Sequence, residues 1–283
     1  VNGTINSAFF SQESGRTSIN NFTNPTPFLQ DGSEGNLNIY GIGSSAGTTM
    51  TFSLGVPTVD FSTNPYSESF NGSTFPPEGW YNQTISGNYS FERVTSGTNP
   101  TCSPQSGSGM ISYKSFSAAA SSSAILATLR LDCSEVQYYR YDFSFYMYRD
   151  TGYSTKADKI EFYLSTLPDF SGTNTLLGTI NRYTGFTPTV PSTGWYQYSF
   201  PLPLPGSGYY YIVCKAISAF GNNMFLDNFS IKKTALPPSP PISPSPENFA
   251  ENVNVAPNFS WVNGGGYPSH YLFYLGTNNP PSN

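Results

Sequence analysis

Turn-forming residues interrupt this chain along its whole length. Its 283 residues include 26 glycines and 24 prolines, and the runs between them are rich in Tyr, Phe, Ile, Val and Thr. Glycine and proline favour turns, whereas aromatic and β-branched residues favour strands. Aromatic residues make up 16% of the chain, which is enough to fill a core and argues against disorder. The sequence therefore predicts an all-β protein made of short strands.

Charge and hydropathy exclude several kinds of partner. The chain has 12 Lys and Arg residues against 17 Asp and Glu residues, for a net charge of −5. Phosphate binding requires a basic patch, so nucleic acid is not expected as a partner. No apolar run reaches the ~20 residues that span a bilayer. The chain begins at Val1 without a start Met or signal peptide, as a mature product or an excerpt of a longer protein would.

Composition divides the chain into four segments. Residues 1–58 are polar and rich in glycine, 66–235 form the most regular part, 236–248 are a Pro-rich linker, and 249–283 follow it. Alternating apolar and polar residues, as in Lys159–Leu164, predict strands. The strands expected are Leu37–Tyr40, Thr48–Leu54, Tyr138–Tyr148, Lys159–Ser165, Gly194–Phe200, Tyr209–Ala216, Met224–Lys232, Asn258–Val262 and Tyr271–Leu275.

The segment 249–283 is too short to close a sandwich, which needs about seven strands and ~100 residues. An open sheet edge with exposed aromatic residues promotes aggregation unless something covers it. We therefore expect another copy of the chain to complete this segment. Head-to-tail completion of this kind, by addition of a β-strand, produces filaments when the rotation does not close.

The main segment resembles a known family of jelly-roll domains. Residues 66–233 are similar to cleaved-adhesin or choice-of-anchor J domains, which resemble MAM domains. The matching residues are Glu68-Ser69-Phe70, Pro76-Pro77-Glu78-Gly79-Trp80, Phe145–Asp150, Gly194–Tyr198 and Gly221–Asn228. The resemblance implies a jelly-roll β-sandwich with smaller β-segments beside it. It also implies a secreted or cell-surface protein, in which such domains act as adhesins or accompany proteases.

The two flanking segments carry weaker resemblances. Residues 249–283 resemble the first half of a fibronectin type III-like domain through Pro257–Trp261 and Tyr271–Thr277. Residues 5–55 are similar to the β-rich tail of immune-inhibitor-A type secreted metalloproteases. Phe9-Phe10, Phe22–Pro25 and Thr49–Phe52 carry that match.

The sequence shows no catalytic motif. A zinc protease needs two His residues with a Glu between them, but this chain contains only His270. His270 stands among Gly, Pro and Ser residues, so we expect a surface loop residue. No nucleophile-elbow pattern is present. A glycosidase needs two carboxylates flanking a sugar bond, and nothing marks such a pair. We therefore predict that this chain is not an enzyme and requires no cofactor.

Calcium is the one metal that the family resemblance implies. Jelly-roll domains of this kind often hold a structural Ca²⁺ with carboxylate and carbonyl oxygens. The matching residues are Glu68 and Asp227, while Asn228 stands where relatives often have a second Asp. The alternative is that both carboxylates are simply solvated.

Aromatic residues admit two interpretations. Trp80, Trp195 and the cluster Tyr138, Tyr139 and Tyr141 can form a stacking platform for sugar rings. A two-sheet core also needs many aromatic residues simply to fill it, and we favour core packing over a sugar platform.

Cysteines and Asn-x-Ser/Thr sequons bear on an extracellular location. Cys102 and Cys133 are candidates for a disulfide, with two unpaired thiols as the alternative, and Cys214 lies in an apolar run typical of a buried strand. Seven sequons permit glycosylation where the source organism allows it. They are Asn2, Asn21, Asn71, Asn82, Asn88, Asn228 and Asn258.

Three functions remain compatible with the sequence. The first is a non-catalytic structural or adhesive surface protein that binds a glycan or surface receptor and assembles head to tail into fibres. The second is a carbohydrate-binding module. The third is a non-catalytic accessory region of a secreted metalloprotease.

Overall fold

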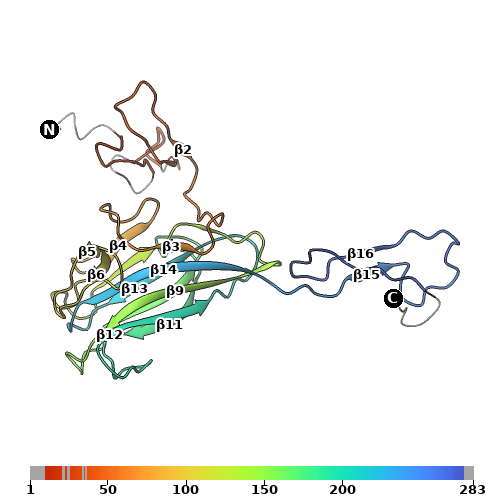
Figure 1. Ribbon diagram of the computed structural model, residues 1–283. Coiled ribbons are helices and arrows are strands. Elements are labelled where there is room, and N and C mark those ends of the chain that lie inside the picture. The colour runs from red at the N-terminus through yellow and green to blue at the C-terminus, as the bar shows by residue number, and fades with distance from the viewer. Residues whose placement is uncertain (1–9, 21–22, 24–25, 34, 36, 277–283) are drawn as a thin grey trace.

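The computed structural model describes residues 10–20, 23, 26–33, 35 and 37–276. A central β-sandwich lies between an N-terminal and a C-terminal segment (Figure 1). All regular elements in the described residues are strands, so the predicted all-β class is confirmed. Within the same residues, no helix is long and apolar enough to cross a bilayer.

One sheet of the sandwich has six antiparallel strands. Its order is β12–β9–β14–β6–β5, and β3 also pairs with β14. The strands are β3 (Tyr66–Glu68), β5 (Phe91–Val94), β6 (Met110–Tyr113), β9 (Tyr139–Arg149), β12 (Gly194–Pro201) and β14 (Met224–Ala235).

The second sheet also has six antiparallel strands, in the order β11–β10–β13–β7–β4 with β8 paired to β13. They are β4 (Tyr81–Ser86), β7 (Ser123–Ala127), β8 (Leu131–Asp132), β10 (Lys159–Ser165), β11 (Asn174–Asn181) and β13 (Tyr209–Ile217). Strands β12, β13 and β14 alternate between the two sheets, as the chain does in a jelly roll.

The core lies where the inner faces of the two sheets meet. Alternate residues of β9 point inward, so Phe143 and Phe145 are fully buried while their neighbours are not. The ring of Phe145 stacks on Phe162 of the second sheet at a centroid distance of 4.1 Å. Phe229 of β14 lies edge-on to Phe143 at 5.3 Å. The aromatic residues that suggested a β-fold thus fill the space between the sheets.

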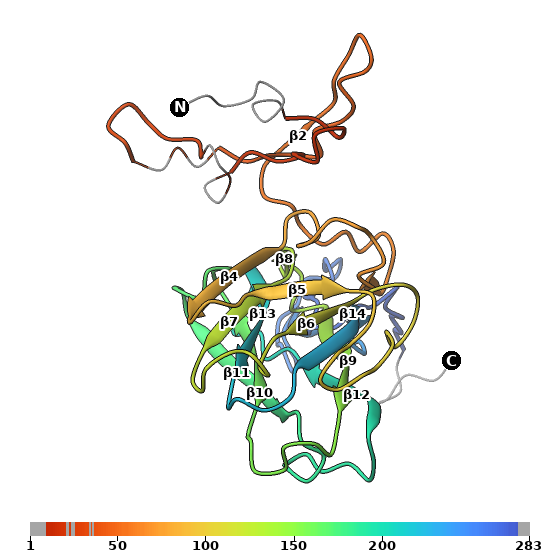
Figure 2. The ribbon, with the colours of Figure 1, turned by 90° about the vertical axis from the view of Figure 1, so that its left-hand side faces the viewer.

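The N-terminal segment contains one two-stranded sheet, β1 (Ile39–Tyr40) and β2 (Ser53–Leu54). Figures 1 and 2 both show this segment outside the sandwich. Its strands are shorter than predicted because most of the segment forms turns and irregular backbone. The resemblance to a protease tail depends partly on Phe9 and on residues 22, 24 and 25, which lie outside the described residues.

The C-terminal segment differs from the prediction in two places. The predicted linker contains a strand, β15 (Ile242–Ser245), which pairs with β16 (Ser260–Val262). The predicted strand Tyr271–Leu275 is wrong, because those residues have no strand pairing. Leu272 and Leu275 in this stretch are more than 70% exposed, so burial of their side chains does not favour pairing of this stretch with another strand.

Candidate functional site

The outer face of the first sheet carries a pair of aromatic residues from two strands. Tyr148 of β9 lies directly opposite Trp195 of β12, and their rings meet edge to face at a centroid distance of 5.4 Å. Tyr146 lies on the same face, opposite Gln197. Tyr146, Tyr148 and Trp195 are half-buried, and Gln197 is exposed. We call these four residues the aromatic face.

The aromatic face presents neutral hydrogen-bonding groups beside its rings. Ser144 and Ser199 lie opposite each other one step further along β9 and β12. Trp195 donates its indole N–H to the Ser103 carbonyl at 3.0 Å, which fixes the ring without burying it. The arrangement offers ring surfaces for stacking and hydroxyl and amide groups for hydrogen bonds.

A loop between β5 and β6, residues 95–109, lies over the neighbouring part of this face. Its Gln105 and Ser106 backbone N–H groups donate to Oδ2 of Asp227 at 2.8 and 3.3 Å. The loop also covers Phe225, which alternation places on the outer face and which is only 1% exposed. Gly97 is required here, because a Cβ at that position would lie 2.9 Å from the Phe225 ring.

Asp227 is a fully buried carboxylate, so the predicted alternative of a solvated side chain is wrong for this residue. Its Oδ1 also accepts a hydrogen bond from the Asn228 N–H at 2.7 Å. Burial raises the pKa of Asp227 to about 6, against the lowering effect of its backbone hydrogen bonds, and the nearby charge of Glu68 raises it further. Two acidic groups therefore lie close enough to repel each other.

The donor atoms around Asp227 and Glu68 suit a hard cation. Glu68 is half-buried on β3, opposite Phe229 of β14, and its Oε1 accepts from the Phe70 N–H at 2.6 Å. The two carboxylates offer oxygen atoms, which Ca²⁺ prefers, and a cation would relieve their repulsion; backbone N–H groups already donate to both. No group of three or more Asp, Glu, His or Cys residues that could hold a metal ion occurs in the described part of the chain, so amide and carbonyl oxygens would have to complete the site.

Trp80 is part of the core and not of a sugar-stacking platform. It is 6% exposed and packs edge-on against Phe70 at 5.6 Å and against Phe229 at 5.7 Å. Its indole N–H points to the Tyr66 hydroxyl at 3.4 Å. The favoured interpretation of core packing therefore holds for Trp80, whereas Trp195 remains accessible on the outer face.

The three tyrosines of the cluster also pack against other residues of the chain. Tyr141 is 1% exposed and lies in the core. Tyr138 and Tyr139 contact Tyr267 of the C-terminal segment at centroid distances of 6.3 and 5.3 Å. The ammonium of Lys233 lies 4.1 Å from the centre of the Tyr139 ring. Tyr138 and Tyr139 therefore join the C-terminal segment to the sandwich, and the favoured interpretation of packing describes the cluster better than a free stacking platform.

Cys102 and Cys133 lie too far apart for the candidate disulfide, which leaves the alternative of two unpaired thiols. Both cysteines are free thiols, with Cys102 near Tyr148 and Cys133 near Tyr141. Those tyrosines are seven residues apart on β9, a span of ~24 Å, whereas bridged Cα atoms lie within ~7 Å. Burial raises the pKa of each of the two thiols to about 12. Cys214 is fully buried, as predicted.

The sequons differ in what their Asn side chains contact. Asn71, Asn88 and Asn258 are exposed. The Asn82 side chain exchanges two hydrogen bonds with the backbone of Phe91, and Asn228 bonds to the loop at Gln105 and Ser106, so both amides are engaged in the folded chain. Asn2 and Asn21 lie outside the described residues.

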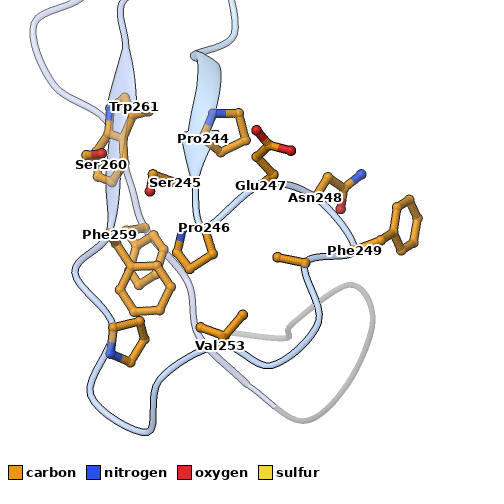
Figure 3. A pocket seen from close by; sticks show the side chains of 13 residues that line it. Pro244, Ser245, Pro246, Glu247, Asn248, Phe249, Val253, Phe259, Ser260 and Trp261 are labelled. Carbon is orange, nitrogen blue, oxygen red and sulfur yellow. The ribbon is translucent and has the colours of Figure 1, made fainter.

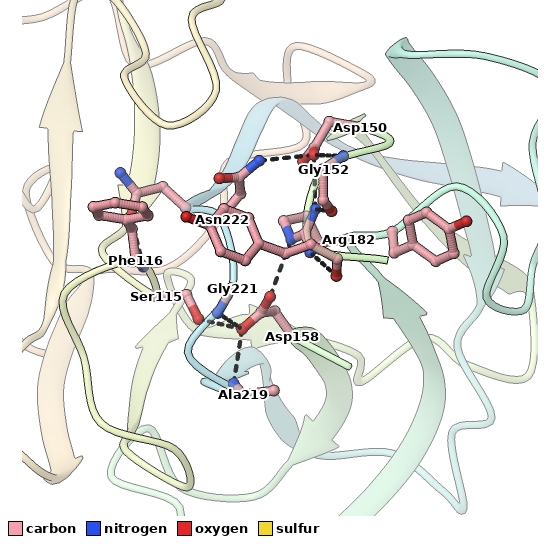
Figure 4. Close-up of polar contacts among 12 residues, drawn as sticks. Ser115, Phe116, Asp150, Gly152, Asp158, Arg182, Ala219, Gly221 and Asn222 are labelled. Atoms are coloured by element: carbon pink, nitrogen blue, oxygen red, sulfur yellow. Dashed lines mark hydrogen bonds and ion pairs between the residues drawn. The ribbon is translucent and has the colours of Figure 1, made fainter. Parts of the chain in front are cut away.

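Figure 4 shows a buried charge network, which the sequence analysis did not identify, among Asp150, Asp158 and Arg182. The Arg182 guanidinium is fully buried and binds Asp150 at 2.7 Å and Asp158 at 3.0 Å. Asp158 also accepts from the N–H groups of Ala219 and Gly221. The network joins the segments around residues 150–158, 182 and 219–221. Because both carboxylates are buried and paired with Arg182, the network stabilises these loops and offers no accessible acid or base.

Charge patterning could have drawn attention to this network. Charged residues make up only 10% of the chain, yet Arg149, Asp150, Asp158 and Arg182 stand within or beside apolar strands. Arg149 is also fully buried, and its donors reach four backbone carbonyls and the Tyr198 hydroxyl. Their partners come from distant loops, which spacing along the chain does not reveal.

His270 lies in the exposed part of the C-terminal segment, as predicted. Its Nδ1 is 2.9 Å from the Ser269 hydroxyl, and both residues are exposed. Within the described residues no carboxylate is paired with this imidazole, so nothing orients it as a general base.

The C-terminal segment also contains an apolar groove of about 560 Å³ (Figure 3). Phe259, Trp261 and Phe273 form one wall, with Trp261 stacked parallel to Phe273 at 6.0 Å. Pro244 and Pro246 lie opposite, and Phe249 points away from the groove. The three wall residues are 38 to 52% exposed, so the sheet of β15 and β16 leaves its rings in contact with solvent.

Comparisons with known proteins find similarity among solved structures alone. No protein-family model matches the chain. No curated protein matches it either. A cleaved adhesin domain of Lys-gingipain from Porphyromonas gingivalis is 18% identical, with a TM-score of 0.43, over 59% of this chain and 97% of that domain.

Two carbohydrate-binding modules are similar at the same level. TmCBM61, solved with beta-1,4-galactotriose, is 17% identical with a TM-score of 0.37, over 59% of this chain and 94% of that chain. The CBM22-1 xylan-binding domain from Paenibacillus barcinonensis is 13% identical with a TM-score of 0.38, over 61% of this chain and 95% of that chain. At these TM-scores none of the three proteins identifies what the present chain binds.

Proposed function

We propose that this chain is a non-catalytic adhesive module that binds carbohydrate on the aromatic face. The observation that supports this is the accessible pair of Tyr148 and Trp195. Both rings lie on the outer face although the core is already filled by other aromatic residues. Rings of this kind stack on the apolar faces of sugars, and the neighbouring Gln197 and Ser199 supply hydrogen bonds to hydroxyl groups. Adhesion to glycans also agrees with the secreted or surface location that the sequence predicts.

The charge of the chain narrows the ligand class. The net charge is −5, and the four side chains of the aromatic face are neutral, while Asp142 further along β9 is paired with Arg140. Acidic polysaccharides would therefore be repelled, so we infer a neutral glycan.

Glycan-array binding followed by calorimetry tests this function. Trp195→Ala and Tyr148→Ala should each weaken binding roughly tenfold or more, since each removes a stacking surface. Trp261→Ala is the matched control, because Trp261 is an exposed tryptophan outside the aromatic face, and its loss should leave the affinity of a single site, measured by calorimetry, unchanged. Failure to bind any neutral glycan, or equal affinity of the Trp195 variant, would refute the proposal.

A second function, self-association, is favoured by the exposed C-terminal groove. Two strands alone are marginally stable in water, and both β15 and β16 keep an unpaired edge within the described residues. We propose that a strand from a second copy of the chain adds to this sheet and covers Phe259, Trp261 and Phe273. Repeated head-to-tail, such pairing would build the fibre that the sequence suggested.

Light scattering after size-exclusion chromatography tests self-association. The whole chain should form species larger than a monomer at rising concentration, and negative-stain microscopy should show filaments. A chain ending at Leu236 lacks β15 and β16 and should remain monomeric. A whole chain that stays monomeric over the same range would contradict the proposal.

We further propose that Asp227 and Glu68 hold a structural Ca²⁺. The support is the juxtaposition of two carboxylates, one of them fully buried. Ca²⁺ should raise the melting temperature at pH 7 relative to EDTA, because a ligand of the folded state stabilises it by mass action. Glu68→Gln should remove most of that increase. The same increase in the variant would contradict a site at this pair.

The third class, an accessory region of a secreted metalloprotease, remains a prediction. An upstream catalytic domain in the complete reading frame would test it.

A further inference from the structure

The loop over the first sheet connects two of its outward-facing side chains. At Ser103 the loop accepts the indole N–H of Trp195 at 3.0 Å. Two residues later, at Gln105, its backbone N–H donates to the buried carboxylate of Asp227 at 2.8 Å. Only Pro104, whose φ is fixed by its ring, separates these two anchors. The indole and the carboxylate are therefore joined by a short and stiff stretch of backbone.

Hydrogen bonds restrain the loop on both sides of the Ser103–Gln105 stretch. Asp227 is fully buried and receives three backbone N–H groups, so its carboxylate has little freedom. On the near side of Ser103, the loop closes on itself through the Gly97 N–H and the Cys102 carbonyl at 2.7 Å. Trp195, by contrast, lies on the edge strand β12 and is only half-buried, with its ring edge to face with that of Tyr148.

We propose that Asp227 is a positioning residue for the aromatic face, which sets the orientation of Trp195 through the Ser103–Gln105 stretch of the loop. This inference rests on the proposed carbohydrate-binding function. Without the fixed carbonyl at Ser103, the indole of an edge-strand tryptophan would sample other rotamers. A ring held in one orientation loses less entropy when a sugar stacks on it, so the loop contributes to affinity without touching the ligand.

The same loop sets the extent of the binding surface. It covers Phe225 and Asp227 on β14, so the exposed surface is confined to β9 and β12 beside it. A glycan would therefore lie against Trp195 and Tyr148 and abut the loop.

The test uses Asp227→Asn in the whole chain, in EDTA so that no cation contributes. Labelling with 5-fluorotryptophan gives one ¹⁹F resonance for each of the three tryptophans. The resonance of Trp195, assigned with Trp195→Phe, should shift or broaden in the variant, whereas those of Trp80 and Trp261 should not move. Affinity for the neutral glycan should fall roughly fivefold to tenfold because the ring is no longer pre-organised.

Asn71→Ala is the matched control. Asn71 anchors the far end of the same loop, where its Oδ1 accepts the Ser108 N–H at 2.6 Å. If both substitutions merely loosened the loop, the ¹⁹F resonance of Trp195 would shift in both variants. If Asp227 positions Trp195 through Ser103–Gln105, the resonance should shift in Asp227→Asn alone. A double-mutant cycle gives the same answer independently: in Trp195→Phe, which lacks the indole N–H, Asp227→Asn should cause little further loss of affinity.

The outcomes separate the two proposals. An unmoved Trp195 resonance in Asp227→Asn, an equal shift in Asn71→Ala, or fully additive losses in the cycle would each overturn the positioning role. A chain that binds no glycan, but whose Trp195 resonance moves as stated, would overturn the carbohydrate-binding function and retain the structural connection. A melting curve of each variant verifies that the sandwich remains folded.

Discussion

The sandwich and the C-terminal segment are both rich in aromatic residues, but only the sandwich buries them. Phe143, Phe145 and Phe229 are at most 1% exposed, whereas Phe259 and Phe273 are about half exposed. The sandwich has two six-stranded sheets that cover each other, while the C-terminal segment has one sheet of two strands. A high content of aromatic residues is therefore not enough to form a buried core. The rings are buried only where a second sheet packs against the first.

The largest difference between the two regions should appear on truncating one ring in each. Phe229→Ala leaves a cavity between the sheets and should lower the free energy of unfolding by about 3–5 kcal/mol. Phe273→Ala removes a ring of the same size that is 52% exposed in the single chain, so at protein concentrations too low for self-association its effect should stay below about 0.5 kcal/mol. Urea denaturation followed by circular dichroism measures both. Similar losses would mean that the C-terminal rings are enclosed, for example by a second copy.

Among the described residues, a buried network of ion pairs is a second feature that the sandwich has and the C-terminal segment lacks. Arg182→Met leaves Asp150 and Asp158 buried without a counter-charge and should cost about 3–5 kcal/mol. Lys159→Met breaks the partly exposed pair with Glu161, which should cost less than about 1 kcal/mol. The same denaturation experiment compares them. Equal losses of unfolding free energy in the two variants would show that the Arg182 network contributes no more to stability than the partly exposed pair.

The pH dependence of stability should also come from the sandwich. Burial raises the pKa of Asp227 to about 6, while an ordinary Asp titrates near 3.8. The folded state thus binds this proton more tightly than the unfolded state. Without calcium, stability from this group should be highest below pH 4 and fall as the pH rises to about 6, by at most about 3 kcal/mol.

The difference between the chain and Asp227→Asn isolates this contribution. Other carboxylates titrate in both proteins, so their effects cancel when urea midpoints at pH 4 and pH 7 are compared in EDTA. The variant should lose less stability over this range than the parent chain. If the parent chain instead gained stability relative to the variant between pH 4 and pH 7, the pKa of Asp227 would be lowered in the folded state and not raised.

Sequence patterns predicted the strands with clear alternation and missed those without it. Lys159–Ser165 was predicted with its observed limits because its apolar and polar residues alternate. Strands β6 and β7 are buried at every residue, so no alternation marks them. Tyr271–Leu275 has a strand-like composition but no facing sheet, and its strand does not form.

The candidate site was predictable only in part. Trp195, Glu68 and Asp227 were singled out from the sequence, but which tryptophan faces solvent depends on strand register and on the sheet opposite. Asp227 was expected on a polar face, yet it is buried because a loop more than 100 residues earlier in sequence covers it. Contacts of that separation leave no periodic signal in the chain.

The smallest expected effect concerns the junction between the two regions. Removing residues 237–283 takes away Tyr267, which packs on Tyr139 and donates its backbone N–H to the Leu236 carbonyl. An aromatic pair contributes about 1 kcal/mol, so the sandwich should unfold at a slightly lower urea concentration with the same cooperativity. Tyr267→Ala in the whole chain should reproduce most of this loss. A loss of several kcal/mol on truncation would mean that the sandwich depends on the C-terminal segment, and the two regions would then be one folding unit.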